Sequence, residues 1–153
     1  VMERNFYSEE AEGLFNYICE TNKSIMNNMS LPSLHRYGLN NEGSLIHICN
    51  TIFSYKPYIE KEVLNCETLV EKIAYLIYNL NSAHVFLDGN KRTILNTVFQ
   101  FLENEEFSLY VPEDILDNDV FKGALAEFLV TMLEEKQTYN DILIWVKSRI
   151  KLK

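Results

Sequence analysis

Nine consecutive residues, from His84 to Arg92, carry side chains that could act together on a phosphate-containing substrate. The imidazole of His84 could accept a proton from a nucleophile. Asp88 offers the hard oxygen that magnesium takes alongside substrate phosphates. Lys91 and Arg92 supply two positive charges, and Gly89 allows the backbone to approach a ligand closely. The set predicts attack by a hydroxyl group on a nucleotide phosphate.

Amphipathic segments on both sides of this loop predict helices at about 67–82 and 91–105. If the second helix begins near Asn90, the N–H groups of its first turn and its dipole form an anion site. The apolar residues at helical spacing are Leu69, Val70, Ile73, Leu76, Ile77 and Leu80 before the loop, and Ile94, Leu95, Val98, Phe101 and Leu102 after it.

A purely structural interpretation of the same residues is also available. A Gly-Asn pair between two helices is commonly only a turn, and a lone histidine is more often structural than catalytic. Cations are disfavoured at a helix start, however, so Lys91 and Arg92 break a local rule. Rules broken without structural gain are typical of functional sites. The residues alone leave both interpretations open.

The stretch His84-Val-Phe-Leu-Asp-Gly-Asn-Lys-Arg92 resembles the signature loop of the Fic/Doc (Fido) family, His-x-Phe-x-(Asp/Glu)-Gly-Asn-(Gly/Lys)-Arg. Its Lys-Arg pair is similar to that of the Doc, or death-on-curing, branch. Arg36–Leu45 is similar to the stretch that precedes the flap in Doc-like toxins, and Glu71–Leu80 to the helix before their loop. The resemblance covers about residues 8–150.

The resemblance implies a role for each loop residue, with ATP and Mg²⁺ as cofactors. His84 would be the general base for a target Ser/Thr hydroxyl, and Asp88 would hold Mg²⁺. Gly89, Asn90 and Lys91 would line the anion hole, and Arg92 would bind phosphate oxygens. Phe86 would be structural. Residues of about 52–62 would form the flap, along which target segments align by strand addition.

Departures from the AMP-transferring Fic pattern favour the Doc reaction. Val85 stands where Pro is usual, Lys91 where Gly is usual, and Leu95 where those enzymes carry a second Arg. Doc also lacks that Arg. One departure from Doc itself is Gly89, where Ala can stand in Doc. The resemblance implies transfer of the γ-phosphate of ATP to elongation factor Tu, with inhibition by a separate antitoxin. A Fic-type AMP transferase and a non-catalytic Fido binding module remain the alternatives.

Composition restricts the class of protein. The chain has 153 residues, of which 47% are hydrophobic and 24% are charged, as expected for one globular domain, 1–153. A net charge of −8 argues against a nucleic-acid partner. No apolar run is long enough for a membrane span. Cys19, Cys49 and Cys66 are typical of reduced thiols in a cytoplasmic protein.

The remaining pattern is that of successive helices, which predicts a mainly α, Fic/Doc-type helical bundle with a short flap hairpin. Ser8 is expected to cap a first helix, and Thr138 with Asp141 a last one whose apolar pattern extends to Ile150. An apolar stripe from 120 to 133 predicts another helix, and alternation from Phe107 to Val111 a short strand.

Three weaker candidates lie outside the loop. The residues Ser8, Glu12 and Gly13 match an inhibitory motif of some Fic proteins, but a capped helix start explains them equally well, and we favour the cap. His35 and His47 lack a partner pattern and are expected to be structural. The chemistry therefore depends on the His84 loop.

Overall fold

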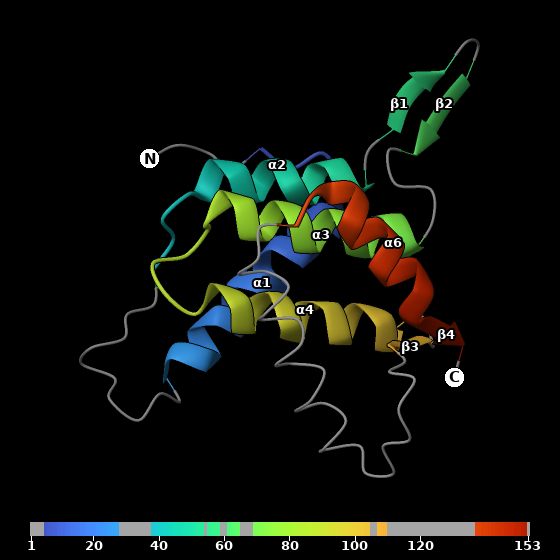
Figure 1. The fold of residues 1–153 in the computed structure, drawn as a ribbon. Helices are drawn as coiled ribbons and strands as arrows, with labels where there is room; N and C mark the ends of the chain where they lie inside the picture. Colours follow the sequence, from blue (N-terminus) through green and yellow to red (C-terminus); the bar gives the residue numbers. More distant parts are fainter. Residues whose placement is uncertain are drawn as a thin grey trace, which may run out of the picture.

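The computed structural model describes residues 5–27, 38–53, 55–58, 61–64, 69–104, 107–109 and 137–152 (Figure 1). Its helices are α1 (Glu9–Asn27), α2 (Glu42–Phe53), α3 (Leu69–Ala83), α4 (Asn90–Asn104) and α6 (Tyr139–Arg149). Its strands are β1 (Tyr55–Tyr58), β2 (Lys61–Leu64), β3 (Phe107–Leu109) and β4 (Ile150–Leu152). The predicted mainly α fold is confirmed.

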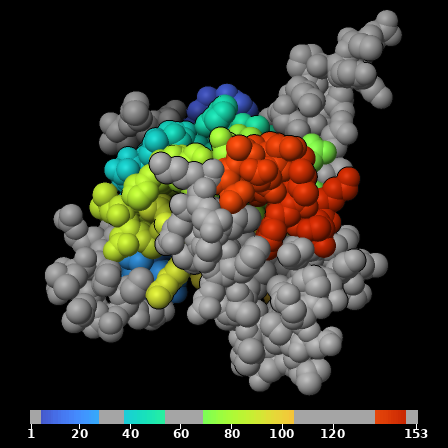
Figure 2. Space-filling model, viewed as in Figure 1, coloured from blue at the N-terminus to red at the C-terminus, as the bar shows by residue number. Residues whose placement is uncertain are grey.

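The five described helices pack against one another, and a loop joins α3 to α4. Helix α1 packs against α2 and α4, while α3 packs against α2, α4 and α6. Figure 2 shows α6 lying across α3 on one face of the molecule, with α2 beside α3. One cluster of buried apolar side chains, drawn from all of these helices, fills the space between them. The two helices that flank the loop are therefore each fixed by several neighbours.

Local sequence signals explain where α1 and α6 begin. The Ser8 hydroxyl oxygen accepts a hydrogen bond from the Ala11 N–H at 3.1 Å, which satisfies one open donor of the first turn. At α6, the Asp141 N–H donates to the Thr138 hydroxyl and the Thr138 N–H donates to the Asp141 carboxylate, each at 3.2 Å. This reciprocal pair is a capping box. Both predicted caps are confirmed.

The buried face of α4 is close to the predicted stripe, with one informative difference. Ile94, Val98 and Leu102 are buried as expected, but Leu95 and Phe101 are only half-buried. Thr93 and Thr97 take the buried positions instead. Because Thr97 can donate its hydroxyl proton to the Thr93 carbonyl oxygen (2.7 Å), its polar group is satisfied inside the core.

Two short antiparallel hairpins complete the described fold. Strands β1 and β2 pair from Tyr55↔Leu64 to Tyr58↔Lys61, which agrees with the predicted flap hairpin, and they project beyond the helices (Figure 1). Strand β3 confirms the predicted extended segment. The sequence pattern places Ile150 in the last helix, and this is wrong: Ile150 begins β4 and pairs with Leu109, because β3 offers a backbone edge there.

Several expectations fall outside the described residues, among them His35, Cys66 and the helix expected over 120–133. Within the described part of the chain, no helix is both long and apolar enough to cross a membrane.

Candidate active site

The loop between α3 and α4 is held in place by a second segment far away in sequence. Residues 38–41 run antiparallel to residues 85–87, with an isolated bridge between Leu39 and Phe86. The backbone hydrogen bonds that join them run from Asn40 N–H to Val85 O (2.7 Å), from Asn41 N–H to Val85 O (3.0 Å) and from Leu87 N–H to Gly38 O (3.0 Å). Residues 38–41, which belong to the stretch that resembles the pre-flap segment of Doc-like toxins, therefore support the loop.

The first part of the loop has two buried side chains between two exposed ones. Val85 and Phe86 are each 1% exposed and fix the loop to the core, as expected for Phe86. His84 and Leu87 lie at the surface. The backbone of His84 has a φ of 47°, in the left-handed region that costs a residue with a Cβ about 1–2 kcal/mol. Such local strain is typical of functional positions.

Helix α4 begins directly after Gly89, whose carbonyl oxygen accepts the Thr93 N–H at 3.0 Å. The N–H groups of a first helical turn have no acceptor within the helix and point along its axis. The side chain of Asn90 is bonded to the backbone of Phe86. The Asn90 side chain therefore holds the loop backbone, while its backbone N–H lies in the first turn of α4.

Gly89 is required by its conformation and by its neighbours. Its φ is +74°, where side chains are disfavoured. A Cβ at this position would also overlap the terminal methyl of Met26 and come within 3.2 Å of Asn22 Nδ2, both on α1. Helix α1 thus packs directly on the backbone of the predicted phosphate cradle.

Asp88 has its carboxylate at the edge of this cradle. Its Oδ1 accepts the Gly89 N–H at 2.8 Å, and its side chain is half-buried. Magnesium is commonly bound by one or two carboxylates together with substrate phosphates. One oriented carboxylate beside an anion site fits that requirement. No cluster of three or more metal-binding side chains occurs among the described residues.

The structure brings all six predicted site residues into one loop and one helical turn. His84 and Asp88 lie in the loop, Gly89 ends it, and α4 continues through Asn90, Lys91 and Arg92. Lys91 is half-buried and Arg92 is exposed. Their charges lie at the positive end of the α4 dipole, so an anion bound there is attracted by both the helix and the side chains.

Sequence reasoning missed Asn22, a fully buried residue of α1. Its side-chain Nδ2 donates to the Asp88 carbonyl oxygen at 2.8 Å and to the Thr93 hydroxyl at 3.1 Å. A signal was present: Ile18, Asn22 and Met26 follow one another at four-residue spacing, so Asn22 lies on the apolar face of α1. A polar residue at a core position calls for a polar partner.

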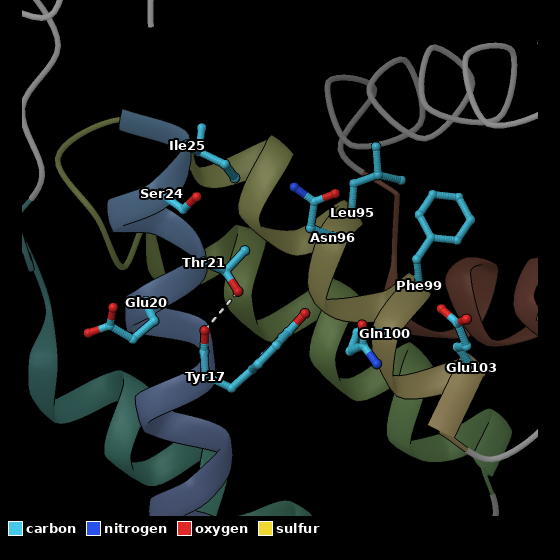
Figure 3. Close-up of a pocket in the computed structure, with 10 residues that line it drawn as sticks. All are labelled: Tyr17, Glu20, Thr21, Ser24, Ile25, Leu95, Asn96, Phe99, Gln100 and Glu103. Atoms are coloured by element: carbon cyan, nitrogen blue, oxygen red, sulfur yellow. Dashed lines mark hydrogen bonds between the residues drawn. The ribbon is translucent and has the colours of Figure 1, made fainter. Parts of the chain in front are cut away.

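A groove of about 690 Å³ lies along one side of the contact between α1 and α4 (Figure 3). Tyr17, Glu20, Thr21, Ser24 and Ile25 line it from α1, and Leu95, Asn96, Phe99, Gln100 and Glu103 from α4. None of these residues belongs to the His84 loop. Leu95 lies one helical turn beyond Lys91 and gives this groove an apolar wall.

The possible inhibitory motif lies toward the other end of α1. Ser8 caps the helix, and Glu12 is exposed in its first turn. Asn22, which contacts the loop, is ten residues further along, or about 15 Å at the rise of an α-helix. The helix-cap interpretation therefore accounts for Ser8 in this structure.

Comparison with known protein families agrees with this geometry. A family model described as the Fic/DOC family matches residues 14–102, which is more than half of the chain. The match includes most of α1, residues 38–41, α2, the β1–β2 hairpin, α3, the His84 loop and most of α4. The helical fold and loop therefore define a Fido-type domain, and the chain belongs to the Fic/DOC family. Its members are generally transferases that use ATP, often with Mg²⁺.

Searches of curated proteins and of solved structures find no match to this chain.

Proposed function

We propose that this protein transfers the γ-phosphate of ATP to a serine or threonine hydroxyl of a protein target, as Doc-like toxins do. The observation that carries the proposal is the first turn of α4, where Lys91 and Arg92 lie at the positive end of the helix dipole. Cations are disfavoured at that end of a helix, and an anionic ligand bound there would be stabilised both by the helix and by these side chains. A nucleotide polyphosphate is such a ligand.

The loop residues suit an in-line phosphoryl transfer. His84 would accept the proton of the target hydroxyl while the oxygen of that hydroxyl bonds to the γ-phosphorus. The bond from that phosphorus to the β–γ bridging oxygen would break, and ADP would leave. Asp88 would hold Mg²⁺, which when bound supplies neutralisation of the phosphate charge. Lys91 and Arg92 would stabilise charge on the phosphate oxygens.

Leu95 favours γ-phosphate transfer over AMP transfer. In the AMP-transferring pattern a second Arg at this place helps to hold the deep β- and γ-phosphates. Here the position is an apolar, half-buried wall of the α1–α4 groove and offers no charge. Without that cation, the reversed pose, in which the γ-phosphate faces the target hydroxyl, competes better. The same resemblance supports elongation factor Tu as target and a separate antitoxin as inhibitor.

Labelled nucleotides distinguish the alternatives. The purified protein is incubated with Mg²⁺, purified elongation factor Tu or a cell extract, and ATP labelled at either the α or the γ position. Label from γ-labelled ATP alone on a target Ser or Thr is the expected result. Label from α-labelled ATP would establish AMP transfer instead. If neither label reaches a protein and MgATP does not bind, the chain is a non-catalytic module.

The metal role of Asp88 has a separate test. Asp88→Asn keeps an oxygen that can accept the Gly89 N–H but removes the negative charge. The Mg²⁺ concentration that gives half-maximal transfer should rise. The matched control is Glu12→Gln, at an exposed acidic residue of α1. Equal Mg²⁺ dependence in wild type and Asp88→Asn would refute the assignment.

A further inference from the structure

We infer that Asn22 is a positioning residue, which holds the Asp88–Gly89 peptide and the first turn of α4 in register. The side chain is 0% exposed, and its Nδ2 donates to Asp88 O (2.8 Å) and to Thr93 Oγ1 (3.1 Å). One amide group of α1 therefore connects the last part of the loop to the start of α4. This inference rests on the proposed function, because it assigns Asn22 to the phosphate site.

Thr93 extends the connection to Gly89. Its hydroxyl donates to the Gly89 carbonyl oxygen at 2.8 Å, and its N–H donates to the same oxygen at 3.0 Å. Asn22 therefore reaches Gly89 through both Asp88 and Thr93. The amide is also the group that a Cβ on Gly89 would meet at 3.2 Å. With so little space between them, a displacement of the amide is transmitted to the cradle backbone.

The local cost of Asn22 supports a role beyond packing. The residue lies between Ile18 and Met26 on the apolar face of α1, where a hydrophobic side chain would fit without needing a polar partner. In the described part of the chain, its Oδ1 has no hydrogen-bond partner, and a buried unsatisfied acceptor is unfavourable. The two bonds that Nδ2 donates to the loop and to α4 offset this cost.

The test compares Asn22→Ala with the matched control Asn50→Ala. Asn50 is 5% exposed and lies on α2, where its amide accepts the Tyr7 N–H and donates to the Asn5 carbonyl oxygen, each at 3.0 Å. Each variant removes one buried amide with two hydrogen bonds, so the two proteins should lose similar global stability. Only Asn22→Ala should disturb the loop. If Asn22→Ala does not fold, Asn22→Leu replaces it, because an apolar side chain of similar volume fills the site but cannot donate a hydrogen bond.

Amide hydrogen exchange gives a readout that needs no activity. Relative to Asn50→Ala, exchange at the Gly89 and Thr93 amides of the Asn22 variant should be about tenfold faster, as for the loss of one ordinary hydrogen bond. Equal exchange in both variants would overturn the positioning role.

Calorimetric titration with MgATP then connects this role to the site. Affinity should fall about tenfold in the Asn22 variant, as for the loss of one ordinary hydrogen bond, and stay at the wild-type value in Asn50→Ala. An Asn22 variant that binds MgATP as wild type does would also overturn the inference. If wild type binds no MgATP, the proposed function fails, and the exchange comparison alone decides whether Asn22 positions the loop.

Discussion

The side-chain amide of Asn90 forms two hydrogen bonds with the backbone of Phe86, four residues earlier in the chain. Its Oδ1 accepts the Phe86 N–H and its Nδ2 donates to the Phe86 carbonyl oxygen, both at 2.9 Å. Phe86 is itself buried in the core. The pair closes a small ring of backbone that contains Asp88 and Gly89. The shape of the candidate phosphate cradle is therefore set largely by the bonds that the Asn90 side chain forms with the loop backbone.

Replacement of Asn90 should open this ring. Asn90→Ala removes both hydrogen bonds, and we expect a loss of about 1–3 kcal/mol in the free energy of unfolding. Transfer activity should fall as well. Asn90→Asp keeps an acceptor for the Phe86 N–H, so its free energy of unfolding should lie between those of wild type and Asn90→Ala. Urea denaturation measures the change, with Asn96→Ala, at an exposed position of α4, as control within about 0.5 kcal/mol of wild type.

His84 should be essential for activity but not for stability. Because its side chain is exposed, His84→Ala should fold normally while transfer falls about 10²–10⁴-fold, the usual contribution of a general base. His84→Gly should be equally inactive yet more stable than the Ala variant by about 1 kcal/mol, because glycine tolerates the φ of 47°. Transfer assays and thermal melts measure both effects. Near wild-type transfer by His84→Ala would refute the role of base.

Gly89 should not tolerate alanine in this chain. Gly89→Ala combines an unfavourable φ of +74° with overlap at Met26, so we expect a loss of about 1–3 kcal/mol. Gly13→Ala is the matched control, since no atom of another element lies within 4 Å of the added Cβ and the helical site should gain about 0.5–1 kcal/mol. Chemical denaturation of both variants measures the difference. A Gly89→Ala protein as stable as wild type would mean that the loop backbone shifts readily.

The buried Cys49 thiol should make the protein less stable at alkaline pH. Burial, with a smaller contribution from Cys19 nearby, raises the pKa of Cys49 from 9.0 to about 12. Above pH 9 the unfolded chain loses this proton while the folded chain keeps it, so stability falls as pH rises between those two values. The slope is at most about 1.4 kcal/mol per pH unit.

Denaturation at roughly pH 8, 9 and 10, on both sides of the ordinary thiol pKa of 9.0, measures this contribution, with Cys49→Ala as the comparison. That variant should have lower stability overall, because it leaves a cavity, but a shallower dependence on alkaline pH. An unchanged slope in Cys49→Ala would show that another group is responsible.

The sequence by itself determined the local features of this protein. Ser8 caps α1 and Thr138 with Asp141 caps α6, because capping depends on residues within four positions of one another. Helical periodicity likewise located α3 and α4 and placed the polar loop between them. The composition of that loop was enough to predict an anion site at a helix start.

Only the tertiary structure decided what holds that loop. Asn22 and Asp88 are 66 residues apart, and their hydrogen bond exists because α1 docks against the start of α4. Whether Leu95 is buried in the core or lines the α1–α4 groove depends in the same way on how α1 packs against α4. Ile150 continues a helical pattern but pairs with β3, whose backbone edge competes with the helix for its hydrogen bonds. Periodicity describes one element at a time, whereas these contacts depend on the relative placement of two.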